Sequence, residues 1–218
     1  PSGSRSPLSF QPLLSPFPPP HRTSTPTRQP PMLPPGLHAR LLELRASGLA
    51  PMADASEQLL QALLGRCGSL AAAWRRIFDP EGCGFVDRNA FTTACADFGL
   101  LEQAAWIFEG LAGGEEILTL ACLDHEAAQA LRDFANFVRC MDADNFEGAF
   151  HDAAVGESLA GWQACLDQQG FLRLCLAVGF NCSNYKKLFE CLDYSCTGVI
   201  RLEDLLFLGR WEVEGSAR

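Results

Sequence analysis

The sequence predicts an all-α protein, made of paired helix-loop-helix repeats in two lobes and preceded by a disordered, proline-rich arm. Three observations support this fold class. Apolar residues recur at helical spacing through most of the chain, and short stretches rich in Gly, Pro and Asp separate those runs. The same order of motifs also occurs twice, which indicates an internal duplication.

Proline marks the predicted arm. Thirteen of the fourteen prolines lie within residues 1–51, and because proline removes a backbone donor and fixes φ, this segment is not expected to form ordinary helices. Met52 stands where a natural start would, so residues 1–51 are expected to contribute little to function. The remainder divides into a first pair (52–123), a connector helix (124–142) with Asp124 as its N-cap, and a second pair (143–218).

Charge narrows the choice of partners. The 218-residue chain has a formal net charge of −9, although its first 51 residues carry five arginines and one acid. An acidic body repels nucleic acid and anionic membranes, and it suits cations or basic partner helices. The longest apolar run, 170–180, is interrupted by Arg173 and is too short to span a membrane.

The ten cysteines indicate a reducing compartment. They form no CxxC pair, and a chain long enough to build a core does not need disulfides. We therefore expect a cytoplasmic protein, and the sequence has no recognisable secretory signal. The thiols expected to be buried and reduced are Cys67, Cys95, Cys140 and Cys175. Cys83 and Cys196, in contrast, fall in predicted exposed loops.

The internal repeat has a fixed spacing. Three pairs of identical residues lie 80 positions apart: Phe91 and Phe171, Cys95 and Cys175, and Gly99 and Gly179. Similar stretches follow each set, at 106–111 and 187–192, and others precede it, at 69–74 and 158–162. Each unit reads as a helix, a short loop and a second helix.

The loops carry a recognisable pattern. An apolar helix ends at an Asp, a glycine follows at loop position 6 (Gly84 and Gly198), and an aliphatic residue stands at position 8 (Val86 and Ile200). In these features residues 56–212 resemble EF-hands of the calmodulin superfamily. The resemblance implies calcium ligands at loop positions 1, 3, 5, 7, 9 and 12, and a short β-bridge between the residues at position 8 of paired loops.

The last loop retains the most of this ligand pattern. Its candidate ligands are Asp193, Ser195 and Thr197 at positions 1, 3 and 5, the Val199 carbonyl at position 7, and Asp204 at position 12. Because Asp204 is one methylene shorter than the usual Glu and position 9 is Arg201, we expect weak calcium binding, with a dissociation constant on the order of 10⁻⁴ M or higher.

The first loop is a weaker candidate. Asp79, Glu81 and Asp87 occupy positions 1, 3 and 9. Cys83 at position 5 is a poor calcium ligand, and Ala90 at position 12 removes the bidentate carboxylate. We therefore expect this loop to be free of metal.

The second loop is not expected to bind metal either. Aligned on Leu118 at position 8, it is one residue short and has Cys122 at position 12. The pair Glu115 and Glu116 could attract a cation only loosely. Its predicted role is structural, because Leu118 can form a β-bridge with Val86.

The third loop is predicted to be truncated. The stretch from Asp79 to Phe91 spans 12 positions, whereas its counterpart from Asp167 to Phe171 spans four, so eight loop residues are missing in this alignment. The last loop would then lack a full partner for its β-bridge. An alternative alignment takes 145–154 as the entering helix and 155–158 as a short loop. Neither alignment yields a metal site.

The predicted function is weak calcium ion binding, at one or two sites at most, by a non-catalytic protein-interaction or sensor module. Its partner would be a basic amphipathic helix of a target protein, held in an apolar groove. The aromatic residues expected to line the grooves are Trp74, Phe91, Phe98, Phe108, Phe171 and Phe189. Two other functions stay open: a metal-independent helical scaffold, and a redox-responsive protein that uses Cys83 and Cys196.

An enzyme is not predicted. The sequence contains no Gly-rich phosphate loop, no GxSxG and no HExxH motif. Its four histidines are scattered, and His151 beside Asp152 is more typical of a solvated helix face than of an acid–base pair.

Overall fold

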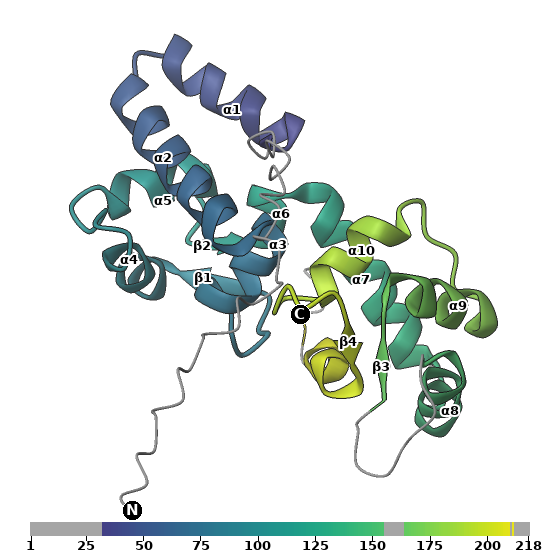
Figure 1. The fold of residues 1–218 in the computed structure, drawn as a ribbon. Coiled ribbons are helices and arrows are strands. Elements are labelled where there is room, and N and C mark those ends of the chain that lie inside the picture. Colours follow the sequence, from purple (N-terminus) through teal and green to yellow (C-terminus); the bar gives the residue numbers. More distant parts are fainter. Residues whose placement is uncertain (1–31, 155–163, 210, 212–218) are drawn as a thin grey trace, which may run out of the picture. The chain divides into compact units, whose positions relative to one another are not determined.

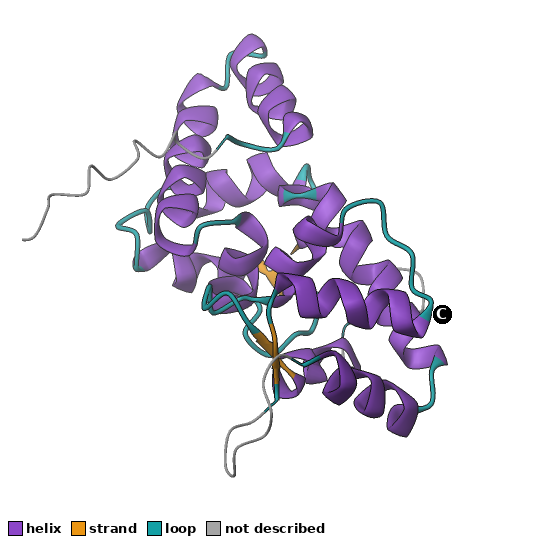
Figure 2. Ribbon diagram, turned by 45° about the vertical axis from the view of Figure 1, so that its right-hand side comes forward, coloured by secondary structure: helices purple, strands orange, loops and turns teal. Residues whose placement is uncertain are grey.

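The computed structural model describes residues 32–154, 164–209 and 211, and most of them are helical (Figure 1 and Figure 2). The predicted all-α class is correct at this level. Within these residues the strands form two short antiparallel pairs: β1 (Phe85–Asp87) with β2 (Ile117–Thr119), and β3 (Cys165–Leu166) with β4 (Ile200–Arg201). No helix in the described ranges combines the length and the apolar character needed to cross a lipid bilayer.

The helices divide between two halves of the sequence. The N-terminal half (residues 32–124) contains α1 (Pro35–Ala46), α2 (Ala50–Cys67), α3 (Leu70–Ala73), the π-helical turn η1 (Trp74–Phe78), α4 (Arg88–Ala96), α5 (Ala104–Ala112) and α6 (Leu120–Leu123). The C-terminal half (residues 125–211) contains α7 (His125–Cys140), α8 (Ala143–Ala153), α9 (Gln168–Val178), α10 (Tyr185–Leu192) and the 3-10 helix η2 (Leu202–Gly209).

Helix α1 lies inside the segment predicted to be a disordered arm, so that prediction is wrong for residues 35–51. Proline stands in the first turn of both α1 and α2, where its missing N–H has no partner to lose. Leu37 and Leu41 of α1 are buried, and α1 packs against α2 (Figure 1). The segment before Met52 therefore contributes to the core. Residues 1–31 of the predicted arm lie outside the described residues.

The 80-residue sequence repeat corresponds to a repeated N-cap structure at the starts of α4 and α9. Asp87 caps α4 by accepting a hydrogen bond from Ala90 N at 2.8 Å. Asp167 caps α9 in the same way, with Gly170 N at 2.7 Å. An Asp side chain at this position satisfies a backbone donor that the first helical turn leaves without a partner. The two helices thus begin alike.

The ends of α4 and α9 are also alike. The repeated glycine after each helix is left-handed, with φ of +70° at Gly99 and +79° at Gly179. The next residue then donates its N–H back to the carbonyl of the repeated cysteine, at 3.1 Å to Cys95 and 2.8 Å to Cys175. Burial raises the pKa of both cysteine thiols to about 12. The sequence repeat is therefore a structural repeat.

The strand pairs show which loops are partners. Val86 lies opposite Leu118 in the β1–β2 pair, as predicted. Leu166 lies opposite Ile200 in the β3–β4 pair, so the prediction that the last loop lacks a strand partner is wrong.

The predicted truncation of the third loop is wrong as well. Asp167 caps α9 as Asp87 caps α4, and both lie four residues before the repeated Phe, so the equivalent of Asp167 is Asp87 and not Asp79. Helix α8 enters this loop, in agreement with the alternative alignment on residues 145–154. Residues 155–163, which include the proposed short loop and the whole stretch matched to 69–74, lie outside the described residues.

Helix α7 occupies the segment predicted as a connector. Its predicted N-cap is confirmed, because Asp124 Oδ1 accepts a hydrogen bond from Ala127 N at 3.0 Å. Leu131 and Phe134 of its apolar stripe are fully buried, and α7 packs against α10 and η2. The ring of Phe134 also meets that of Phe171 edge-on, at 5.6 Å between centroids. The helix is therefore part of the core of the C-terminal half.

The aromatic residues expected to line open grooves are inside the protein. Those that are buried are Trp74, Phe91, Phe108, Phe171 and Phe189. Phe98 is half-buried, with the Arg66 guanidinium 5.5 Å from its ring centroid. The apolar surfaces predicted to hold a partner helix are thus covered by the protein's own packing.

The thiols differ from prediction at two positions, and one of them is Cys83, which is half-buried although it was expected in an exposed loop. Cys67, Cys95 and Cys175 are buried as expected, whereas Cys140, at the last residue of α7, is exposed. Cys196 is exposed as predicted. All ten cysteines lie in the described residues, and no disulfide joins any two of them.

Candidate metal centre

The last loop begins where α10 ends. The carbonyl oxygen of Asp193 accepts a hydrogen bond from Cys196 N at 3.0 Å. Two left-handed residues bend the chain, Cys196 with φ of +55° and Gly198 with φ of +79°. Glycine takes this conformation at little cost, whereas a residue with a Cβ is strained there. The loop therefore curls around the side chain of its first residue.

The carboxylate of Asp193 holds the loop closed. Its Oδ1 accepts a hydrogen bond from Thr197 N at 3.0 Å, and its Oδ2 accepts one from Gly198 N at 2.7 Å. The side chain is buried, so these backbone donors replace the water that a carboxylate would otherwise bind.

Four oxygens of the predicted ligand set lie together in this loop. Ser195 Oγ and Thr197 Oγ1 are each 3.3 Å from Asp193 Oδ1 and 3.2 Å from each other. Thr197 Oγ1 is 3.2 Å from the Val199 carbonyl oxygen. Calcium binds oxygens at about 2.4 Å, so two ligands at right angles are about 3.4 Å apart. Hydrogen bonds of the two hydroxyls hold these oxygens together, and the resulting separations are close to the edge length of a calcium coordination shell.

Asp204, the candidate at position 12, is partly committed to the backbone. Its Oδ2 accepts a hydrogen bond from Arg201 N at 2.8 Å. Burial raises the pKa of the Asp204 carboxyl, and the negative charges of Glu203 and Asp193 add to this rise. The guanidinium of Arg201 is paired with Glu203, at 3.8 Å between Nη1 and Oε1.

The first loop has the same backbone frame. Asp79 is buried, its Oδ1 accepts from Cys83 N at 2.7 Å, and its Oδ2 accepts from Gly84 N at 2.8 Å. The Asp79 carbonyl accepts from Gly82 N at 3.2 Å. Gly82 and Gly84 are left-handed, at the positions that Cys196 and Gly198 hold in the last loop. The side chains around the carboxylate differ between the two loops. In the first loop the indole Nε1 of Trp74 donates a hydrogen bond to Asp79 Oδ2 at 3.3 Å.

The three carboxylates predicted as ligands in the first loop are not brought together. Asp87 serves as the N-cap of α4, and Glu81 is exposed. Across the described ranges, no three His, Cys, Asp or Glu side chains gather where they could hold one ion. A site in the last loop would accordingly depend on two carboxylates together with hydroxyl and carbonyl oxygens.

Arg75 is a residue that the sequence analysis does not predict, and its side chain donates a hydrogen bond to the main chain of the first loop. Its Nη1 donates to the Asp79 carbonyl oxygen at 2.7 Å, and its guanidinium lies 3.9 Å from the ring centroid of Phe207 in η2. The ring of Tyr194, in the last loop, lies 5.9 Å away. Burial lowers the pKa of Arg75, while the negative charge of Asp79 opposes that shift. Arg75 therefore links the first loop to the last.

The second loop gathers no comparable set of oxygens in the residues described. Gly113 and Gly114 both have positive φ, and Glu115 and Glu116 are exposed beside them. Cys122, at position 12, lies 3.6 Å from the Thr119 hydroxyl. The structural contribution of this loop is therefore the strand β2.

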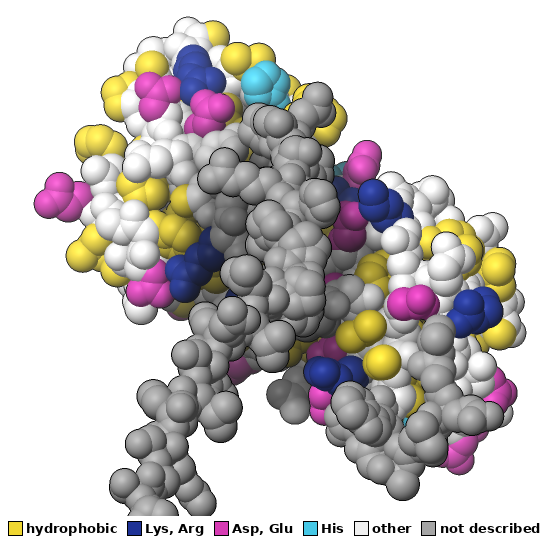
Figure 3. All heavy atoms as spheres, in the orientation of Figure 1, with side chains coloured by type: hydrophobic (Ala, Val, Ile, Leu, Met, Phe, Trp, Pro, Cys, Tyr) yellow, Lys and Arg dark blue, Asp and Glu magenta, His cyan; other side chains and the backbone are white. Residues whose placement is uncertain are grey.

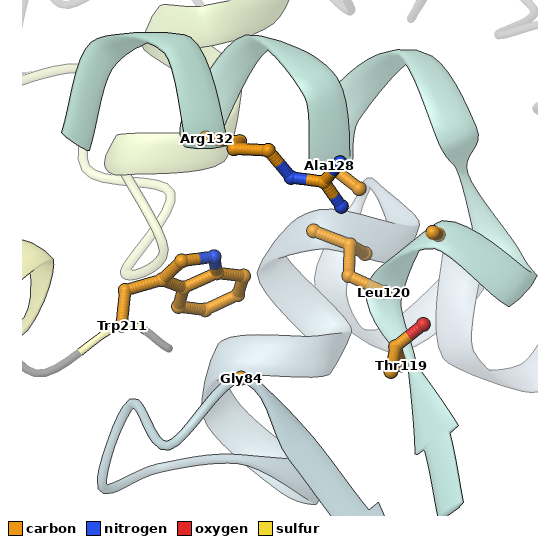
Figure 4. Close-up of a pocket in the computed structure, with 7 residues that line it drawn as sticks. Gly84, Thr119, Leu120, Ala128, Arg132 and Trp211 are labelled. Carbon is orange, nitrogen blue, oxygen red and sulfur yellow. The ribbon is translucent and has the colours of Figure 1, made fainter. Parts of the chain in front are cut away.

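A small cavity lies between Gly84 of the first loop and the side chain of Trp211 (Figure 4). Its lining residues are Gly84, Thr119, Leu120, Ala121, Ala128, Arg132 and Trp211. The indole of Trp211 and the side chain of Arg132 both extend into this region from the C-terminal half. The volume of about 20 Å³ is close to the minimum for one water molecule, so the cavity is not a ligand pocket.

A scan against models of protein families finds no match for this chain, and searches of curated proteins and of solved structures find none either.

Proposed function

We propose that this chain is a calcium-binding protein of the EF-hand type with one weak site, in its last loop, and that it acts without catalysis as a protein-interaction or sensor module. The observation that carries the proposal is the gathering of oxygens from Asp193, Ser195, Thr197 and Val199 at the spacing of a calcium shell. The strand pair formed by Ile200 and Leu166 supports the site by fixing the end of the loop.

The ligand charges set the expected strength. Asp193 and Asp204 supply two negative charges, and the other protein ligands are neutral oxygens. Because fewer carboxylates and a shorter side chain at position 12 both weaken an EF-hand, we expect a dissociation constant on the order of 10⁻⁴ to 10⁻³ M. In the bound state the hydroxyls of Ser195 and Thr197 would turn their lone pairs toward the ion, since hydroxyl hydrogens rotate freely.

A basic amphipathic helix remains the proposed partner of the sensor function. Such binding needs an opening of the core, because the aromatic residues that would line a groove are buried. On the face in Figure 3, acidic and basic side chains are interspersed among the described residues, so no area of one sign marks a docking site there.

A metal-independent scaffold is the second candidate, and one observation favours it. Asp79 and Asp193 each accept two backbone N–H hydrogen bonds that close the loop, so neither loop needs an ion to keep its shape. The two candidates differ in whether calcium binds at all.

Calorimetric titration of the full chain with calcium distinguishes them. The calcium-binding proposal predicts saturable heat in the millimolar range. The double variant Ser195→Ala/Thr197→Val removes two exposed ligand oxygens and leaves the carboxylate–amide bonds intact, so affinity should fall at least about tenfold, or 1.4 kcal/mol. The matched control is Glu81→Ala, at position 3 of the first loop, which should bind as the wild type does.

Two results would contradict the calcium proposal. An absence of heat with the wild-type chain would leave the scaffold as its function. Equal affinity in the wild type and the double variant would place the binding site outside the last loop.

A further inference from the structure

Two cysteines from distant parts of the chain lie against each other. Cys67 is the last residue of α2, and Cys196 is at position 4 of the last loop, 129 residues later. The thiol of Cys196 donates to the main-chain carbonyl oxygen of Cys67, at 3.0 Å from Sγ to O. A Cβ built on Gly68 would lie 4.0 Å from the same sulfur. The Cys196 sulfur therefore lies beside the peptide group that joins Cys67 to Gly68.

This placement is compatible with a covalent bond between the two sulfurs. A carbonyl oxygen is about 2.4 Å from its own Cα, so the Cys196 sulfur is already within about 5.4 Å of Cys67 Cα. A disulfide needs Cα atoms about 4.4–6.8 Å apart and sulfurs about 2.05 Å apart, so its formation here requires each side chain to rotate about its Cα–Cβ bond and bring the two sulfurs together. Burial raises the pKa of the Cys67 thiol; Arg76 and Arg66 lower it, and Cys196 raises it further, in keeping with the closeness of the thiols.

The two cysteines differ in ways that suit sequential oxidation. Cys196 is exposed, whereas Cys67 is buried beside it. The backbone of Cys196 is also strained, because among the described residues it is the one non-glycine residue with positive φ. An accessible thiol reacts first with an oxidant, and a neighbouring thiol then resolves the product.

We propose that Cys67 and Cys196 form a reversible disulfide when the protein meets hydrogen peroxide. In the first step the Cys196 sulfur takes one oxygen from the peroxide as the O–O bond breaks, which gives a sulfenic acid and one water. In the second step the Cys67 sulfur attacks the Cys196 sulfur, so the S–S bond forms, the S–O bond breaks, and the hydroxyl leaves with the Cys67 proton as water. The two thiols lose two electrons in total, and the peroxide is reduced to two waters.

The cross-link would tie the end of α2 to the last loop. It differs from the redox function of Cys83 and Cys196 that the sequence leaves open, because the contact of Cys196 is with Cys67. The bond itself does not depend on calcium. If the calcium proposal holds, the bond would also fix position 4 of the metal loop and change its affinity.

The test is treatment of the reduced, full-length protein with hydrogen peroxide, followed by intact mass measurement and peptide mapping. We expect a loss of about 2 Da, for two hydrogens, a linked peptide that contains Cys67 and Cys196, and reversal by dithiothreitol. Cys196→Ser should abolish the linked peptide, and since this residue is exposed the variant should fold. Cys83→Ser is the control and should form the link as the wild type does.

Two results would overturn the proposal. One is oxidation of Cys196 to the sulfinic acid without any linked peptide. The other is a linked peptide that joins a different pair, or one that persists in Cys196→Ser. Neither readout involves calcium, so failure of the disulfide and failure of the calcium site are separable.

Discussion

The first and last loops share one backbone frame but fill it with different atoms. In each, a buried Asp accepts hydrogen bonds from the amides four and five residues later. In the first loop the remaining donor is the indole of Trp74, whereas in the last loop the hydroxyls of Ser195 and Thr197 surround the carboxylate. The comparison teaches that the shape of such a loop and its capacity for an ion are separate properties.

The difference decides where a cation could bind. Backbone amides donate to the carboxylate in both loops, but in the first loop the indole N–H of Trp74 points a further positive hydrogen at Asp79 Oδ2 and so opposes a metal ion there. Hydroxyl and carbonyl oxygens beside Asp193 can instead direct lone pairs at an ion. We infer that the first loop is a permanently closed structural element and that the last loop is the one with room for chemistry.

The largest expected effect is on stability in the absence of metal. Asp79→Ala leaves Cys83 N, Gly84 N and Trp74 Nε1 without their acceptor, and an orphaned buried donor costs about 1–3 kcal/mol. We therefore expect a loss of about 3 kcal/mol or more in the free energy of unfolding. Asp193→Ala should cost less, about 2 kcal/mol, because the exposed hydroxyls of its loop can turn to water.

Urea unfolding of both variants without calcium measures this difference. An equal or smaller loss at Asp79 would contradict the distinction between the two loops.

A smaller effect is expected where the loops meet. The Arg75 guanidinium stacks on Phe207 at 3.9 Å in a buried position, and a desolvated cation–π contact contributes about 1–2 kcal/mol. In a double-mutant cycle with Arg75→Met and Phe207→Leu, we expect a coupling energy of about 1 kcal/mol. Urea unfolding of the four proteins measures it. Additive losses would show that Arg75 packs near Phe207 without linking the loops energetically.

Some of this arrangement could be predicted from the sequence because local rules determine it. The N-cap at Asp124 and the bridge between Val86 and Leu118 follow from residue type and spacing. The closeness of the Asp193, Ser195 and Thr197 oxygens follows in the same way, since alternate loop positions face one centre, and their role as calcium ligands stays a prediction. Helix α1 escapes prediction because proline usually breaks helices, although at the first-turn position that Pro35 holds it permits one.

Other features depend on contacts that spacing does not encode. Arg75 and Arg76 are adjacent in an apolar run, yet Arg75 is buried and Arg76 is exposed, because Arg75 packs against Phe207, more than 100 residues later in the chain. The contact between Cys67 and Cys196 joins residues 129 positions apart. The alignment of Asp167 with Asp79 is wrong because spacing alone does not distinguish Asp79 from Asp87, whereas the N-caps of α4 and α9 do.

The most direct test places the same carboxylate in both loops. Asp204→Glu restores the longer side chain at position 12 of the last loop, and Ala90→Glu introduces it at position 12 of the first. By calcium calorimetry the account predicts tighter binding in Asp204→Glu, by about tenfold or 1.4 kcal/mol, and no new site in Ala90→Glu. Binding gained by Ala90→Glu, or no gain in Asp204→Glu, would contradict the claim that the last loop alone has room for an ion.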